Sequence, residues 1–145
     1  MIRKAAASDA GTVLELVRAY YQYDGIDFDE QKVRPALERL LAAPDLGFVH
    51  LVETDGRIVG YAMATWGYDV EFGGRFALLT DLYVMRDFWG AGFGRSLVAA
   101  VEQAAKEGGA SALEGQVMRG NERARSFYHE WGFRFPDRLL MSRRL

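Results

Sequence analysis

The sequence predicts an α/β protein in which a central mixed, mostly antiparallel sheet carries helices on both faces. Two observations lead to this fold class. Apolar spacing and turn residues place strands and helices in the order β-α-α-β-β-β-α-β-α-β, and Asp55-Gly56 is a strong signal for a tight hairpin. Hairpins make antiparallel pairs, whereas a crossover helix allows a parallel one. The 145 residues, without repeats or linkers, predict one domain over residues 1–145.

The first part of the chain is expected to form a strand and two helices. The strand is expected at residues 2–7, and the Ser-Asp pair at residues 8–9 is expected to cap the first helix. The second helix is expected to begin near Arg34 rather than at Asp29, because Pro35 suits the first turn of a helix and not its interior.

The middle of the chain is expected to form three strands. Two of them, at residues 48–53 and 57–66, flank the Asp55-Gly56 turn. Residues 67–74 contain several glycines and are expected to break the pattern before a third strand at residues 75–85.

The last part of the chain is expected to alternate helices and strands. A helix begins at about Arg95 and ends at Gly108-Gly109, where glycine suits the end of a helix. A strand at residues 112–118, a helix capped by Asn121 and ended by Gly132, and a final strand at residues 138–143 follow in this order.

Glycines at positions 90, 92 and 94 lie between an apolar strand and a helix. Without Cβ atoms, successive backbone N–H groups can turn inward on an anion, and the start of the helix adds its positive dipole. Two known phosphate loops do not fit: no Gly-Lys pair occurs, and the third glycine comes one residue too early for a dinucleotide loop. The segment therefore predicts a phosphate site for a nucleotide-like cofactor, and a plain strand-to-helix turn is the alternative.

Composition excludes several classes of function. A net charge of −2 argues against a nucleic-acid surface. No apolar run approaches membrane-spanning length, and the N-terminal residues lack the apolar core of a signal peptide, so a cytoplasmic location is expected. With no cysteine and only two histidines, thiol nucleophiles and a metal centre are not expected. The remaining side chains suit group transfer from a preactivated carrier.

The order of elements, the glycine loop and the segment from Asn121 to Phe133 together resemble the GNAT superfamily of N-acetyltransferases, in motif style closest to polyamine and diamine acetyltransferase-like members. The resemblance runs from about Phe48 to Phe133 and implies a GNAT-like fold, with acetyl-CoA as cosubstrate. Trp89 stands where the family has glutamine or arginine, so Arg95 or Arg86 is expected to support the phosphates.

The resemblance also implies which residues bind the cofactor. Backbone groups from Leu82 to Val84 would align the pantetheine arm, and an amide near Val84 would polarise the thioester carbonyl. The implied cofactor-binding residues are Leu82, Tyr83, Val84, Trp89, Gly90, Ala91, Gly92, Phe93, Gly94, Arg95, Asn121, Ala124, Phe127 and Tyr128.

Tyr128 is the best catalytic candidate, because a phenol can give a proton to the departing thiolate. Spacing alone would make it a core tyrosine, and the resemblance favours the catalytic role. Asp81 lies in an apolar strand, where an ionisable group is costly unless it is partnered or used, so a catalytic or substrate-binding role and a structural role stay open. Thr80 replaces the glutamate that polyamine-acetylating relatives often carry, which leaves Glu114 and His129 as alternative bases.

Acidic and aromatic loops are expected to bind the acceptor, because carboxylates and aromatic rings together attract ammonium groups. Solvated loops are the alternative. The expected substrate-binding residues are Tyr23, Asp24, Asp27, Asp69 and Glu71. The expected activity is direct acetyl transfer to a primary amine, with a small, polyamine-like cation as the acceptor. A protein lysine or N-terminal amine, and a non-catalytic acyl-CoA-binding module, are the alternatives. A homodimer is expected from the family alone.

Overall fold

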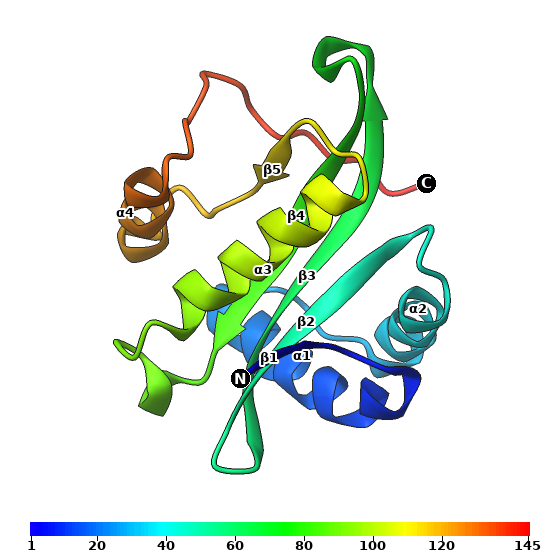
Figure 1. Ribbon diagram of the computed structural model, residues 1–145, viewed down its shortest axis with the longest axis vertical. Coiled ribbons are helices and arrows are strands. Elements are labelled where there is room, and N and C mark those ends of the chain that lie inside the picture. The colour runs from blue at the N-terminus through cyan, green and yellow to red at the C-terminus, as the bar shows by residue number, and fades with distance from the viewer.

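A computed structural model describes residues 1–145 and shows a five-stranded sheet in the order β1-β2-β3-β4-β5 (Figure 1). Only β4 and β5 run parallel, and the other neighbours are antiparallel, as the sequence predicts. The strands are β1 (Ile2–Lys4), β2 (Gly47–Thr54), β3 (Arg57–Asp69), β4 (Gly74–Val84) and β5 (Leu113–Gly115).

Helices cover both faces of this sheet. Figure 1 shows α3 (Phe93–Glu107) crossing one face, with α1 (Ala10–Asp24) and α2 (Glu30–Ala42) on the other and α4 (Glu122–Trp131) beyond the β5 edge. Each face has its own buried core: Leu14 and Val17 of α1 pack on one, and Leu97 and Val101 of α3 pack on the other. None of the helices is both long enough and apolar enough to cross a bilayer.

The β2–β3 hairpin confirms the turn prediction. Asp55 and Gly56 both have positive φ, 50° and 72°, as a two-residue turn matched to strand twist requires. The expected break after Trp66 is wrong, because β3 continues to Asp69. At Gly67 a Cβ atom would lie 2.4 Å from the Phe76 ring of β4, so this glycine allows cross-strand packing and does not end the strand.

The two N-terminal helices begin differently from the prediction. The second starts at Glu30 and not near Arg34, because the Asp29 carboxylate accepts a hydrogen bond from the backbone N–H of Gln31 at 3.1 Å and fixes the first turn, with Pro35 inside the helix. The Asp9 carboxylate does not cap α1. It accepts instead from the N–H of Ala6 at 2.7 Å and from Arg3, and α1 begins at Ala10.

Other differences lie at the ends of elements. The first and fifth strands are shorter than expected, and α3 begins at Phe93 because Gly92 already turns the chain with a φ of 83°.

The final strand expected at residues 138–143 does not form. The outer edge of β5 stays unpaired. The Arg138 side chain pairs with Glu71, and the backbone N–H of Arg138 donates to the carbonyl of Pro136. Without a partner strand, the Leu139 and Met141 side chains remain 78% and 92% exposed.

Candidate active site

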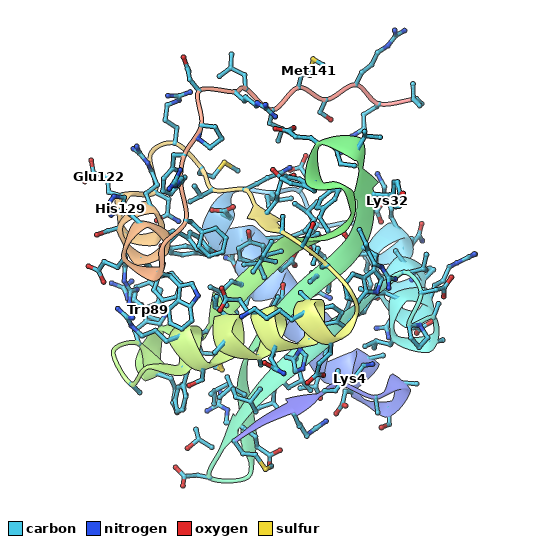
Figure 2. All side chains as sticks on the ribbon, turned by 45° about the horizontal axis from the view of Figure 1, so that its top comes forward. Lys4, Lys32, Trp89, Glu122, His129 and Met141 are labelled. Carbon is cyan, nitrogen blue, oxygen red and sulfur yellow. The ribbon has the colours of Figure 1, made fainter.

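The candidate site is a cavity of about 350 Å³ where β4 and β5 separate. The two strands pair only between residues 77–79 and 113–115. Beyond that point the chain leaves β5 toward α4, and the space between is lined by β4, the glycine loop, the start of α3, one face of α4 and the end of α1. Figure 2 shows Trp89 at this place, close to both α3 and α4.

Most of the expected cofactor-binding residues come together here. Those lining the cavity are Leu82, Tyr83, Val84, Trp89, Gly90, Gly92, Phe93, Gly94, Arg95, Asn121, Ala124, Phe127 and Tyr128. Ala91 lies in the same loop but does not line the cavity.

The glycine loop has the properties of an anion site. Gly90 and Gly92 have φ values of 85° and 83°, and a Cβ atom at either would meet nothing within 4 Å. These glycines are therefore required by backbone conformation and not by crowding. The backbone N–H groups of residues 90–95 have no hydrogen-bond partner within the protein. A run of free N–H groups at the start of a helix fits a pyrophosphate.

The cavity wall on β4 depends on a bulge. Met63 of β3 pairs with Asp81 and the next residue, Ala64, pairs with Leu79, so Thr80 is the extra residue. The Thr80 hydroxyl donates to the Met63 carbonyl at 3.2 Å. The bulge lets Leu79, Thr80 and Leu82 all line the cavity. Beyond Leu79, the outer edge of β4 has no partner strand and can accept an extended ligand.

Tyr128 reaches the cavity from α4. The Asn121 carboxamide caps this helix by accepting from the Ala124 N–H at 3.1 Å, and Tyr128 packs against Phe127 and Phe133 with ring centroids 5.3 Å apart in both cases. Burial, and then the nearby charges of Asp24 and Asp81, raise the pKa of Tyr128 to about 12. The phenol therefore stays protonated at neutral pH and can donate a hydrogen bond into the cavity.

Asp81 lies beneath the cavity and does not line it. Its side chain faces the α1 and α2 side of the sheet, and the buried Tyr61 hydroxyl donates to its Oδ2 at 2.6 Å. Burial raises the pKa of Asp81, and the hydrogen bond from Tyr61 partly opposes this effect. The carboxyl thus has a hydrogen-bond partner. Its negative charge also contributes to the raised pKa of Tyr20 and of Tyr128.

The expected acceptor residues separate into two groups. Tyr23 and Asp24 line the cavity, where the Tyr20 hydroxyl donates to Asp24 at 3.4 Å. Asp24 is the one carboxylate among the lining residues. The other three expected residues, Asp27, Asp69 and Glu71, lie outside the cavity.

Local contacts explain why Asp69 and Glu71 lie outside the cavity. Asp69 caps the short turn between β3 and β4 by accepting from the N–H of Glu71 at 2.9 Å, and Glu71 pairs with Arg138 at 3.3 Å. The alternative bases Glu114 and His129 are exposed and also lie outside the cavity.

Several lining residues were not expected from the sequence. They are Leu79, Phe88, Gln116, Val117, Met118 and Arg123. The sequence predicts residues 116–118 to belong to a strand. Because β5 already ends at Gly115, these residues line the cavity instead. No local signal in the sequence brings Arg123 next to Trp89, because the contact joins α4 to a distant loop.

Comparisons with known proteins agree with this geometry. The Acetyltransferase (GNAT) family profile matches residues 12–133. A thialysine N-epsilon-acetyltransferase of Bos taurus is 29% identical over 91% of this chain and 82% of its own length.

Two solved structures have the same fold. An integron cassette protein from the mobile metagenome of Cole Harbour Salt Marsh superposes with a TM-score of 0.88 at 27% identity, covering 99% of this chain and 90% of its own. The aminoglycoside N-acetyltransferase AAC(6')-Iy in complex with CoA gives a TM-score of 0.86 at 19% identity, covering 99% and 93%. The profile match, the free N–H groups of the glycine loop and the open β4 edge agree, and the chain belongs to the GNAT family as an N-acetyltransferase with acetyl-CoA as its cosubstrate.

Proposed function

We propose that this enzyme transfers the acetyl group directly to a small cationic primary amine. The observation that carries the proposal is Asp24, the one carboxylate lining an otherwise largely apolar cavity. It lies beside Tyr20 and Tyr23, and a carboxylate with aromatic neighbours attracts ammonium groups. The names of the thialysine N-epsilon-acetyltransferases of cattle, pig and mouse, which are 27–29% identical, support an acceptor with a primary amine.

The donor half of the site is formed by backbone. Acetyl-CoA supplies a reactive thioester: a C–N bond forms as the C–S bond breaks, and the proton lost by the amine balances the one gained by sulfur. The free N–H groups of residues 90–95 would hold the pyrophosphate, and the open edge of β4 from Leu82 to Val84 would align the pantetheine arm. The chain contains no cysteine, which favours direct transfer without a thioester on the enzyme.

Tyr128 would act at the leaving sulfur. Its pKa of about 12 lies roughly three units above that of an ordinary thiol, so complete proton transfer from the phenol to a thiolate is uphill by about 4 kcal/mol. A hydrogen bond from the phenol that stabilises the thiolate avoids this cost. The proton that the amine releases then protonates the thiolate sulfur.

Asp24 would prepare the amine. An ammonium group must lose a proton before it can attack, and Asp24 can hold the cation and take up that proton directly or through a water molecule. Asp81 would act at a distance, through the charge that it holds beneath the cavity.

Replacing the carboxylate tests the acceptor class. Asp24→Asn should lower kcat/KM for diamines and thialysine by about 10- to 100-fold, because a charged hydrogen bond at a partly desolvated site is lost. Steady-state release of free thiol measures this rate, and CoA affinity should not change. Asp27→Asn is the matched control, since Asp27 is exposed and lies outside the cavity.

Two outcomes would contradict the proposal. Equal rates for Asp24→Asn and the wild type would remove Asp24 from the acceptor site. Turnover of lysine peptides or N-terminal peptides without turnover of any small amine would favour the protein-acceptor alternative. The family assignment favours catalysis over the non-catalytic acyl-CoA-binding alternative.

Three further expectations stay predictions. A homodimer is expected from the family and is tested by light scattering in solution. A cytoplasmic location and the absence of a nucleic-acid partner are expected from the sequence, and cell fractionation and a nucleic-acid binding assay test them.

A further inference from the structure

Trp89 lines the cavity and has a fixed position there. Its indole N–H donates to the Val84 carbonyl at 2.7 Å, and the Tyr23 ring meets it edge-on with centroids 6.0 Å apart. The donor of the indole is therefore already used. Trp89 occupies the position where the resemblance implies a basic or amide side chain, but it cannot itself donate to a phosphate.

Arg123 lies over this ring. Its guanidinium carbon is 3.6 Å from the ring centroid, a close cation–π contact, and Arg123 lines the same cavity from the first turn of α4. The guanidinium makes no ion pair with a carboxylate, and it is absent from the hydrogen bonds that arginine side chains donate within the protein. It is a positioned cation whose N–H donors are free.

The other nearby arginines differ from Arg123. Arg95 lines the cavity, but its guanidinium pairs with Glu130 at 3.1 Å. Arg86 is exposed, is 5.8 Å from the Trp89 ring centroid, and does not line the cavity. Among the cations named here, Arg123 alone combines a lining position with free donors.

We propose that Arg123, held on the face of Trp89, binds the pyrophosphate of acetyl-CoA beside the free N–H groups of residues 90–95. A guanidinium held over an aromatic ring by a cation–π contact uses none of its N–H groups in that contact, and two of these can bind two phosphate oxygens in a bidentate arrangement. The Trp89–Arg123 pair thus supplies, from two separate segments, the side-chain donor that position 89 lacks. The inference rests on acetyl-CoA as cosubstrate and is independent of the acceptor amine.

Binding measurements with three ligands test the assignment. Isothermal titration calorimetry would compare CoA, dephospho-CoA, which lacks only the 3′-phosphate, and pantetheine, which has no phosphate. Arg123→Ala should weaken CoA and dephospho-CoA alike by about tenfold and leave pantetheine unchanged, with a loss that shrinks at high salt. Arg134→Ala removes the same charge from an exposed side chain outside the cavity and should leave all three affinities unchanged.

A second variant separates a phosphate contact from a general effect on folding. Trp89→Arg in the Arg123→Ala background places a cation at position 89 and should recover most of the lost CoA affinity. Circular dichroism melting would check that both variants fold.

The contrary results are distinct. A loss for CoA but not for dephospho-CoA would place Arg123 at the 3′-phosphate and overturn the assignment. Equal CoA affinities for Arg123→Ala and the wild type would overturn it as well, while leaving the proposed acetyl transfer untouched. No CoA binding by the wild type would contradict both.

Discussion

Tyr128 offers the sharpest test of catalysis by a single side chain. Tyr128→Phe removes the one phenol of α4 that reaches the cavity and keeps the ring that packs on Phe127 and Phe133. We expect kcat to fall by about 10- to 100-fold with CoA affinity unchanged, since the lost hydrogen bond acts on the charge that develops at sulfur. Stopped thiol-release assays give kcat, and calorimetry gives the affinity.

The pH profile supplies the control. Because the pKa of Tyr128 is raised to about 12, its ionisation should not reduce wild-type activity below about pH 10. An activity loss near pH 10 that disappears in Tyr128→Phe would show an unperturbed phenol and contradict the buried site. Unchanged kcat in Tyr128→Phe would make this residue part of the core alone.

Single residues also show what the sequence could reveal about the site. Asn121 caps the helix that carries Tyr128, and helical spacing already places the two residues near the same surface. Asp69 and Glu71 carry the carboxylates that an amine site needs, but they lie at the end of the sheet away from the cavity. Nothing in the local sequence indicates on which side of the cavity the β3–β4 turn lies. Arg123 was not identified because its contact with Trp89 depends on the docking of α4.

The glycine loop permits a matched comparison between two glycines with the same backbone conformation. Gly92 and Gly109 have φ values of 83° and 84°, and a Cβ atom at either would meet nothing within 4 Å. Alanine at each position should therefore destabilise the fold by a similar amount, about 1 kcal/mol. Only Gly92→Ala should also weaken CoA binding, by several-fold, because it disturbs the unpaired N–H groups of the loop that lines the cavity.

Thermal melting and CoA titration of both variants check this expectation. Equal CoA affinity in Gly92→Ala and Gly109→Ala would mean that the loop does not hold the phosphates. A loss of CoA affinity in Gly109→Ala would mean that the effect is one of general stability.

Elements were predictable where a local signal decides the conformation. The Asp55-Gly56 turn and the glycine ends of α3 and α4 are of this kind. Gly67 was misread because a glycine that breaks a strand and a glycine that admits a facing ring look alike in sequence. The segment at residues 138–143 has strand-like residues, but a strand also needs a partner, and no other part of the chain pairs with it here.

The whole fold places one charged group in an unfavourable position. The sheet separates two apolar cores, and Asp81 is the one buried charged residue, held only 7% exposed with Tyr61 as its hydrogen-bond donor. Natural proteins commonly retain such a group where function uses it, at the expense of stability. The dependence of the free energy of unfolding on pH can therefore reveal whether the buried charge of Asp81 destabilises the fold.

The sign of this dependence follows from the raised pKa. Burial raises the pKa of Asp81 above its ordinary value of 3.8, so the folded state binds its proton more tightly than the unfolded state does. The stability linked to that proton is complete below about pH 3.8 and is lost as pH rises through the higher folded-state pKa. At neutral pH the ionised carboxylate therefore destabilises the fold.

Asp81→Asn should remove this penalty, because a carboxamide oxygen still accepts from Tyr61 without a charge. We expect a melting temperature about 2–4 °C above the wild type at pH 7, with the difference vanishing near pH 3.

Asp9→Asn should have the opposite effect on stability. Its pKa is lowered to about 2, first by the hydrogen bond from Arg3, so that variant should be less stable at pH 7, and the deficit should fade as pH drops from about 3.8 toward 2.

Calorimetric melting from pH 2 to pH 8 separates the two carboxylates, because it covers the pH windows of both. If Asp81→Asn is more stable than the wild type and also slower in acetyl transfer, the buried charge serves the reaction at the expense of the fold. If it is more stable and equally active, Asp81 belongs to the structure alone and its proposed role in catalysis fails. A variant less stable than the wild type at pH 7 would show that the hydrogen bond from Tyr61 outweighs the cost of burial.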